Sequence, residues 1–186
     1  GEQLQGRAAE TLAGFEELVL SVRRDDSKLE GHIRVMSPTT LTMQHLGPVL
    51  NAFLARHERI TMELSLVDVS SNPEETGFDV AISGRNASYE GVIDVPLSSA
   101  SPRLVASPVY LGRRGSPAHP RELGGHDCLV FAPTGRVWQF QSSRGTLSVE
   151  VTPRLTVDDN LTLLDAVRTG LGIGPVPAYV AAPALA

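Results

Sequence analysis

The sequence has one cysteine, one lysine and no long apolar run. A single cysteine, Cys128, cannot form a disulfide within the chain, which favours a reducing compartment such as the cytoplasm. No stretch approaches the roughly 18 apolar residues of a membrane span, and the first residues lack the apolar core of a secretory signal. The net charge of −5, with scattered arginines, argues against this chain gripping nucleic acid by itself. Any DNA contact must come from another segment.

Patterns that would indicate catalysis or metal binding are also missing. The five histidines show no metal-ligand spacing, so we expect no metal and no cofactor. The run Gly170–Gly174 imitates a glycine-rich phosphate loop, but it follows a helix and enters a strand, the reverse of a dinucleotide fingerprint. Cys128 lies in an apolar strand, where a buried thiol is inert. We therefore expect a protein that is not an enzyme.

What the sequence does contain begins with a long amphipathic helix, predicted within residues 1–28. Roughly 22 residues of it form a rod of about 33 Å. Apolar residues recur at steps of three and four, which is the seam of a helix that packs on a partner helix. The alternative is that this helix packs back on its own domain. We predict oligomerisation through the apolar positions Leu4, Leu12, Phe15, Val19 and Val22.

From Gly31 onward, predicted strands alternate with predicted helices. The first set has a helix around residues 46–54 and a short one near 73–76, with strands at 32–36, 60–66, 78–82, 92–97 and 103–106. This order, with strongly apolar strands, indicates a mainly parallel sheet flanked by helices.

A second set of elements begins near residue 107. Helices are predicted near 108–111 and 120–123, and from Asn160 to a glycine stop at 170–172. The predicted strands are 128–132, 138–141, 146–151, 154–157 and 173–176. The chain therefore divides into a linker helix (1–28), a first lobe (29–104) and a second lobe (105–186).

Six segments, in this order and spacing, resemble the effector-binding domain of LysR-type transcriptional regulators. They are Leu29–Val35, the helix containing Leu46–Leu50 and Phe53, Gly77–Ile82, Ala106–Leu111, His126–Leu129 and Gly170–Gly174. The resemblance covers essentially the whole chain. It implies an α/β fold of two Rossmann-like lobes joined by a hinge, similar to type 2 periplasmic binding proteins, with a ligand cleft between the lobes. The preceding helix matches the family's linker helix, which pairs in dimers.

The resemblance also implies partners. We expect a small-molecule effector such as a carboxylate, a homodimer or homotetramer, and DNA contact only through an N-terminal winged helix-turn-helix that this sequence lacks. The sequence also ends before the strand and helix that normally complete the first lobe, so we expect a fragment. We expect a cytoplasmic location and no contact with membranes. The alternative is a stand-alone solute-binding protein of the same architecture. The amphipathic helix argues against it, because a solute receptor has no use for a dimerising helix.

The first candidate site follows the first predicted strand, at Ser37, Thr39 and Thr40. Hydroxyls and free backbone N–H groups at a helix N-terminus bind a carboxylate or similar anion. In a parallel sheet this turn lies at the carboxyl end of the strand, where ligand crevices form. The alternative is that one of these residues only caps the helix. The resemblance favours Thr40 as a pocket hydroxyl.

Further candidates follow other predicted strands. In the second lobe, Asp159 or Asn160 is expected to cap a helix, and Asp158 and Asp159 would disfavour a strongly anionic effector. Phe131 is either an apolar wall of the pocket or plain core. The complete predicted set of effector-binding residues is Ser37, Thr39, Thr40, Ser70, Ser83, Phe131, Asp158 and Asn160.

Overall fold

The structure is a computed structural model that describes residues 29–68, 71–84, 88–97, 101–143 and 145–185. The chain divides into two compact units, residues 1–99 (unit 1) and 100–186 (unit 2), which are described separately. The predicted helix within 1–28, with Leu4, Leu12, Phe15, Val19 and Val22, lies outside the described residues, as does Ser70.

Unit 1 is built on a small parallel sheet in the order β2-β1-β3. Its strands are β1 (Gly31–Ser37), β2 (Ile60–Leu66) and β3 (Val80–Ala81). The register aligns Ser37 with Leu66 and Met36 with Ala81, so all three carboxyl ends meet at one edge. The strand predicted over residues 60–66 is confirmed by the span of β2, but the predicted alternation in burial holds only for its first half, because Leu64 and Leu66 are exposed.

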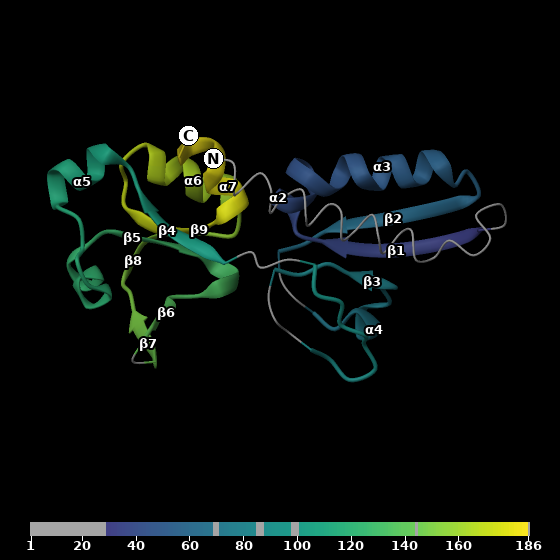
Figure 1. Cartoon of the computed structure of the whole chain (residues 1–186), viewed down its shortest axis with the longest axis horizontal. Coiled ribbons are helices and arrows are strands. Elements are labelled where there is room, and N and C mark those ends of the chain that lie inside the picture. The colour runs from purple at the N-terminus through teal and green to yellow at the C-terminus, as the bar shows by residue number, and fades with distance from the viewer. Residues whose placement is uncertain (1–28, 69–70, 85–87, 98–100, 144, 186) are drawn as a thin grey trace. The chain divides into compact units, whose positions relative to one another are not determined.

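A single helical segment connects β1 to β2, and Figure 1 shows its longest part, α3, running beside these two strands. It consists of α2 (Thr39–Leu41), a π-helical turn η1 (Thr42–Leu46) and α3 (Gly47–Arg56). The helix N-terminus predicted at residues 37–40 is confirmed by α2, although these first turns lack the apolar periodicity of α3. Pro48 has no N–H, and its ring would clash with a carbonyl four residues earlier in a regular α-helix. In the π turn the Gly47 N–H donates instead to the Thr42 carbonyl.

Two expectations for unit 1 were wrong. The strand predicted over residues 78–82 is reduced to the two residues of β3, preceded by the short helix α4 (Pro73–Thr76) at its predicted place. Residues 92–97 form no strand; they follow a turn in which the Val92 N–H donates to the Tyr89 carbonyl. An apolar run there was not enough to specify a strand, because no described strand pairs with it.

Unit 2 is built on a mixed sheet in the order β4-β9-β5-β8. Its strands are β4 (Pro102–Ala106), β5 (Cys128–Phe131), β8 (Pro153–Val157) and β9 (Ile173–Pro177). Strands β9, β5 and β8 run parallel, and β4 pairs antiparallel with β9. This pairing places β4 in unit 2, so the division of the chain lies earlier than the predicted boundary after residue 104.

Helices and a hairpin complete unit 2. The hairpin joins β6 (Val137–Ser142) and β7 (Gly145–Glu150) in antiparallel register. The helical elements are α5 (Pro108–Arg114), the 3-10 helices η2 (Pro120–Gly125) and η3 (Ala132–Thr134), α6 (Asn160–Arg168) and α7 (Ala178–Leu185). In Figure 1, α6 and α7 lie on one side of the sheet and the hairpin on the other.

The core of unit 2 consists of two apolar clusters separated by the sheet. One contains Tyr110, Leu123, Cys128, Val130, Trp138, Val151 and Ile173, and the other Leu129, Leu163, Val167, Val176, Val180 and Ala181. Strand β5 supplies both, because successive side chains of a strand point to opposite faces. This explains why β5 is apolar throughout rather than alternating.

Candidate functional site

The carboxyl edge of the unit 1 sheet carries three buried hydroxyls. Ser37 ends β1, Thr40 lies in α2, and Thr42 begins the π turn; their exposed fractions are 0%, 1% and 4%. The residue at the N-cap position is Pro38, which makes no side-chain capping bond. The interpretation that one of these hydroxyls merely caps the helix is therefore wrong, and the first backbone N–H groups lack that partner.

Two of the three hydroxyls satisfy one another. The Thr42 Oγ1 atom lies 2.7 Å from Ser37 Oγ and 2.8 Å from the Pro38 carbonyl oxygen. A carbonyl can only accept, so the single hydroxyl proton of Thr42 goes to the Pro38 carbonyl and the Ser37 hydroxyl donates to Thr42 Oγ1. Ser37, predicted as an effector contact, is thus engaged inside the protein.

Thr40 differs from its neighbours. Its Oγ1 atom is buried and has no hydrogen-bond partner among the described residues. Burying a hydroxyl without a partner costs about 1–3 kcal/mol, so such atoms in folded proteins call for an explanation. A ligand that hydrogen-bonds Thr40 would remove this cost.

The remaining predicted residues of unit 1 are placed less favourably. Thr39 is half-buried at the first position of α2. Ser83 is exposed and lies two residues beyond the end of β3, at the same carboxyl edge as Ser37. The structure gives neither residue the burial of Thr40.

The carboxyl edge of the unit 2 sheet brings together Phe131 and the residues that follow β8. Phe131 ends β5 and is the register partner of Val157, the last residue of β8. The next residue, Asp158, is exposed, whereas Asn160 is 4% exposed at the first position of α6. Phe131 packs on the second apolar cluster, which fits its alternative role as core.

Asp159 is the residue that caps α6. Its Oδ1 atom accepts from the Thr162 backbone N–H at 2.7 Å and from the Thr162 hydroxyl at 2.7 Å. The hydroxyl bond, with help from the backbone N–H groups of Thr162 and Leu161, holds the pKa of Asp159 below its usual value against the opposing effect of burial. The carboxylate is therefore charged at neutral pH, one residue before Asn160.

Asn160 repeats the situation of Thr40. Asp159 caps the helix, so the side chain of Asn160 is not needed for capping. Its Oδ1 atom is buried with no hydrogen-bond partner among the described residues. Each unit thus holds one such polar atom in the first turn of a helix that follows the carboxyl end of a parallel strand. This is where α/β sheets bind ligands.

Sequence reasoning missed the part played by Thr42. Its signal was faint, since a threonine five residues after Ser37 meets it only because the helix begins at residue 39. The π turn was missed as well, although Gly47-Pro48 within an apolar helix pattern marked a place where regular α-helix fails.

The two features that imitate catalytic motifs have structural explanations. Cys128 is fully buried and its thiol points to the Leu123 carbonyl at 3.5 Å. Burial, with a smaller contribution from Asp127, raises the pKa of the Cys128 thiol to about 11. Gly170 has a φ of 80° directly after α6, as expected for a helix stop. Within the described ranges, no three His, Cys, Asp or Glu side chains gather as metal ligands would, and no helix has the length and apolar character needed to cross a membrane.

An α/β fold with polar residues gathered at the carboxyl ends of parallel strands is that of a small-molecule-binding domain. Residues 26–186 match the LysR substrate binding domain, and the chain belongs to this family. The predicted α/β class with two lobes and the predicted family are confirmed.

Curated relatives agree with this assignment. The chain is 26% identical over 188 residues to a probable HTH-type transcriptional regulator, LtrA, of Klebsiella pneumoniae, which covers 100% of this chain and 61% of the relative. It is 31% identical over 183 residues to the HTH-type regulator YhjC of Escherichia coli, covering 96% of this chain and 61% of YhjC. The chain thus spans about three fifths of the length of these relatives.

Solved structures show the same fold. The full-length virulence activator AphB of Vibrio cholerae superposes with a TM-score of 0.73 at 26% identity, covering 100% of this chain and 64% of AphB. The regulatory domain of AphB from Vibrio vulnificus gives a TM-score of 0.70 at 26% identity, covering 84% of this chain and 79% of that domain.

Proposed function

We propose that this chain is the effector-sensing region of a LysR-type transcription regulator, and that Thr40 and Asn160 bind the effector. The family assignment supports a ligand-binding role. Two observations carry the choice of residues: Thr40 Oγ1 and Asn160 Oδ1 are among the buried side-chain atoms without a partner in the described residues, and both lie in the first turn of a helix that follows a parallel strand. A ligand that hydrogen-bonds such an atom would gain more than the bond itself, because it also removes a cost present in the free protein.

The two atoms constrain the chemistry of the effector. A hydroxyl and the first backbone N–H groups of α2 favour an acceptor such as a carboxylate or carbonyl. The Asn160 oxygen can only accept, so it requires a hydroxyl or amine donor. With Asp158 and the charged Asp159 beside Asn160, that end of the effector is neutral or cationic. Thr40 therefore favours an acceptor group and Asn160 a donor group, and hydroxy acids and amino acids carry both kinds of group.

The proposed function as a regulator also implies a mode of action and partners. We propose that the effector acts through its different affinity for two states of the protein, which is the only free energy it can contribute. We also propose that the protein forms a homodimer or homotetramer paired through residues 1–28. We propose a cytoplasmic location, and DNA contact through a helix-turn-helix domain. The matched relatives are regulators, which favours this function over a stand-alone solute-binding protein.

A thermal-shift screen tests the proposal. The chain is screened against hydroxy acids, amino acids, other organic acids, aromatics and sugars. A ligand at 100 times its Kd adds about 2.7 kcal/mol, which raises the Tm of a domain of this size by roughly 5–11 °C. We expect a hydroxy or amino acid to give the shift, and Thr40→Ala and Asn160→Ala each to abolish it. A shift that both variants retain would contradict the assignment of these residues.

A further inference from the structure

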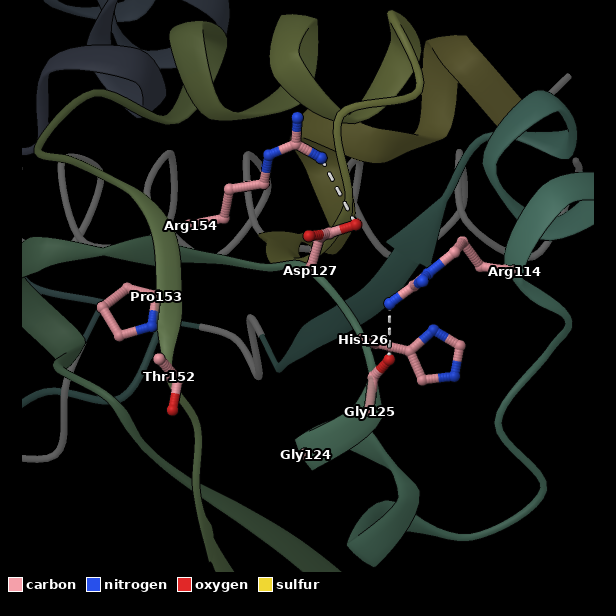
Figure 2. Close-up of a pocket in the computed structure, with 8 residues that line it drawn as sticks. All are labelled: Arg114, Gly124, Gly125, His126, Asp127, Thr152, Pro153 and Arg154. Atoms are coloured by element: carbon pink, nitrogen blue, oxygen red, sulfur yellow. Dashed lines mark hydrogen bonds and ion pairs between the residues drawn. The ribbon is translucent and has the colours of Figure 1, made fainter.

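A groove of about 470 Å³ opens at the other edge of the unit 2 sheet. It lies where β5 and β8 begin, at Asp127 and Pro153, whereas Phe131 and Asn160 follow the carboxyl ends of the same strands. Figure 2 shows its two walls, one carrying Thr152 and Pro153 and the other the turn that ends in His126. The groove is open to solvent, and none of the proposed effector residues lines it.

The charged side chains of the groove give it a positive balance. Arg114 comes from the end of α5 and Arg154 from β8, and Asp127 is the carboxylate among the lining residues. The Arg154 Nη1 atom lies 3.3 Å from Asp127 Oδ2 and donates to the Leu171 carbonyl at 3.1 Å. Asp127 thus neutralises Arg154, and Arg114 is left as the uncompensated charge, in a chain whose net charge is −5.

Arg114 is held in place but keeps most of its donors. Its Nη2 atom donates to the Gly125 carbonyl at 2.8 Å, the one hydrogen bond that it makes within the described part of the chain. Figure 2 shows the guanidinium reaching from α5 toward this carbonyl at the groove. A guanidinium has five N–H donors in a rigid fork that matches carboxylate and phosphate oxygens. Its neighbour Arg113 instead donates to the Gly170 carbonyl, outside the groove.

The wall that ends in His126 contains two glycines that the fold does not require, Gly124 and Gly125. Neither Gly124 nor Gly125 has a positive φ. A Cβ atom added at either position would meet no atom within 4 Å. Backbone strain and close packing therefore do not explain these glycines, whereas a ligand that approaches the bare backbone does.

We propose that this groove binds a small oxyanion, with the Arg114 guanidinium as its cationic contact and the backbone of Gly124-Gly125 as one wall. Phosphate and carboxylate share the required chemistry, namely oxygen acceptors with negative charge. Such a ligand would bind unit 2 separately from the effector.

Titrations of the ¹⁵N-labelled chain with inorganic phosphate and with succinate test the proposal. Ionic strength is held constant with sodium chloride, because phosphate also stabilises proteins by exclusion from their surface. We expect saturable shifts of the Gly124, Gly125 and His126 amide resonances with at least one of the two anions, while the amides of Thr40 and Asn160 stay in place. The anion that saturates identifies the source of the ligand. No saturable shift with either anion would overturn the proposal.

Three variants make the test specific. Arg114→Gln should weaken anion binding about tenfold or more, since it removes a charged donor. Gly124→Leu fills the groove while leaving the Arg114 contact with Gly125 intact, and should abolish binding without changing the urea midpoint. The control is Arg121→Gln. Arg121 belongs to η2, as Gly124 does, but it does not line the groove, so this variant should bind the anion as the wild type does. Equal weakening in Arg121→Gln, or unchanged binding in Arg114→Gln and Gly124→Leu, would contradict the site.

Discussion

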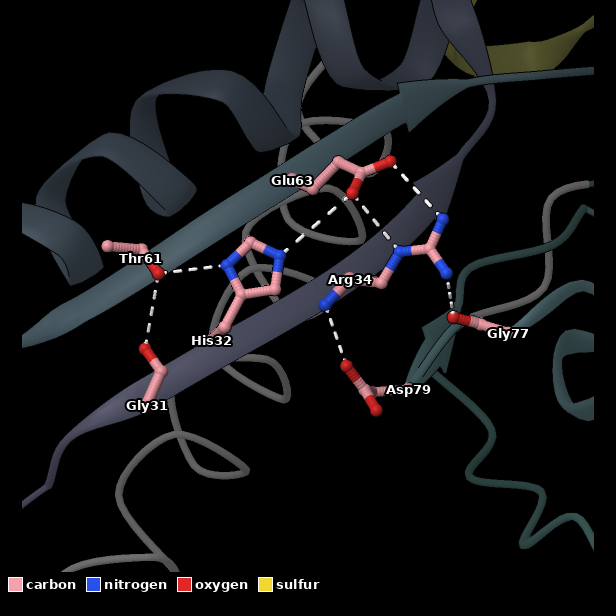
Figure 3. A network of polar contacts seen from close by, with 7 residues as sticks. All are labelled: Gly31, His32, Arg34, Thr61, Glu63, Gly77 and Asp79. Atoms are coloured by element: carbon pink, nitrogen blue, oxygen red, sulfur yellow. Dashed lines mark hydrogen bonds and ion pairs between the residues drawn. The ribbon is translucent and has the colours of Figure 1, made fainter.

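Unit 2 packs two apolar clusters against its sheet, whereas the sheet of unit 1 is held on one face by polar contacts. Both apolar clusters found in the described residues lie in unit 2. In unit 1, His32 and Arg34 of β1 share a face and lie opposite Thr61 and Glu63 of β2. Figure 3 shows these side chains joined in one network across the two strands.

Arg34 is the centre of this network. Its guanidinium binds both oxygens of Glu63 at 3.1 and 3.3 Å and donates to the Gly77 carbonyl at 2.6 Å, while its carbon Cζ lies 4.9 Å from the centre of the Phe78 ring. Its backbone N–H donates to Asp79 at 2.7 Å. One arginine thus joins β1 to β2 and to the segment that leads into β3. Because unit 1 relies on partly exposed polar contacts and unit 2 on buried apolar clusters, the two units should respond differently to core truncation, salt and pH.

The largest expected effect is on unit 2. Leu163 is fully buried in the second cluster, so Leu163→Ala should lower the free energy of unfolding by about 2–5 kcal/mol. Trp138, the single tryptophan of the chain, lies in unit 2, so its fluorescence during urea denaturation measures this unit. A loss below about 1 kcal/mol would show that this cluster does not determine the stability of unit 2.

A smaller effect is expected for Arg34→Met, which keeps an apolar stem but loses the network. The contacts are partly exposed, so we expect the free energy of unfolding to fall by about 1 kcal/mol. Added salt should reduce this difference, because it screens the ion pair in the wild type. The loss should appear in the far-ultraviolet circular dichroism transition and leave the Trp138 transition unchanged. An equal shift of both signals would mean that the two units unfold together, and the comparison would fail.

Acid should weaken unit 1 through Glu63. The hydrogen bond from Arg34, with the charge of Arg34 and a smaller effect of His32, lowers the pKa of Glu63 below its usual value of 4.5. A carboxyl with a lower pKa in the folded state contributes stability above its unfolded pKa and loses it as pH falls through the folded pKa. The Tm from circular dichroism should therefore fall below about pH 4.5 more in the wild type than in Glu63→Gln. Parallel Tm curves for the two proteins would refute this role.

The smallest effect concerns Cys128 and changes reactivity rather than stability. With a pKa of about 11 in the folded protein, its thiolate fraction at pH 8 is about one thousandth. The thiol should react with a disulfide reagent only as fast as the protein unfolds, and the rate should rise in urea. Rapid reaction of the folded protein at pH 8 would contradict its burial.

Much of the fold could be predicted because it is encoded locally. Residues 60–66 alternate and form β2 with these bounds, and Pro73–Thr76 forms α4 where the turn residues indicated a short helix. The helix N-terminus was predicted at residues 37–40 and α2 begins at Thr39, but the π turn η1 was not predicted, because the contact between Thr42 and Ser37 leaves no apolar stripe in the sequence. Residues 92–97 were misread because strand formation depends on a pairing partner, which an apolar run does not supply.

The candidate site was predictable in position but not in detail. The rule that ligands bind at the carboxyl ends of parallel strands led to Thr40 and Asn160. The sequence could not show that Ser37 is paired with Thr42, or that Asp159 rather than Asn160 caps α6, because both depend on atomic distances. The groove at Arg114, Gly125 and Arg154 joins residues far apart in the chain and has no local signal.

The central claim is that the Thr40 hydroxyl is kept unpaired for the effector, and a matched pair of variants tests it most directly. Thr40→Val and Thr42→Val remove the hydroxyls of two buried threonines in one helical segment, and urea denaturation followed by circular dichroism measures both without ligand. We predict that Thr40→Val stabilises the free protein by about 1 kcal/mol and that Thr42→Val destabilises it by about 1–3 kcal/mol, since it leaves Ser37 without its partner. A destabilised Thr40→Val would contradict the claim.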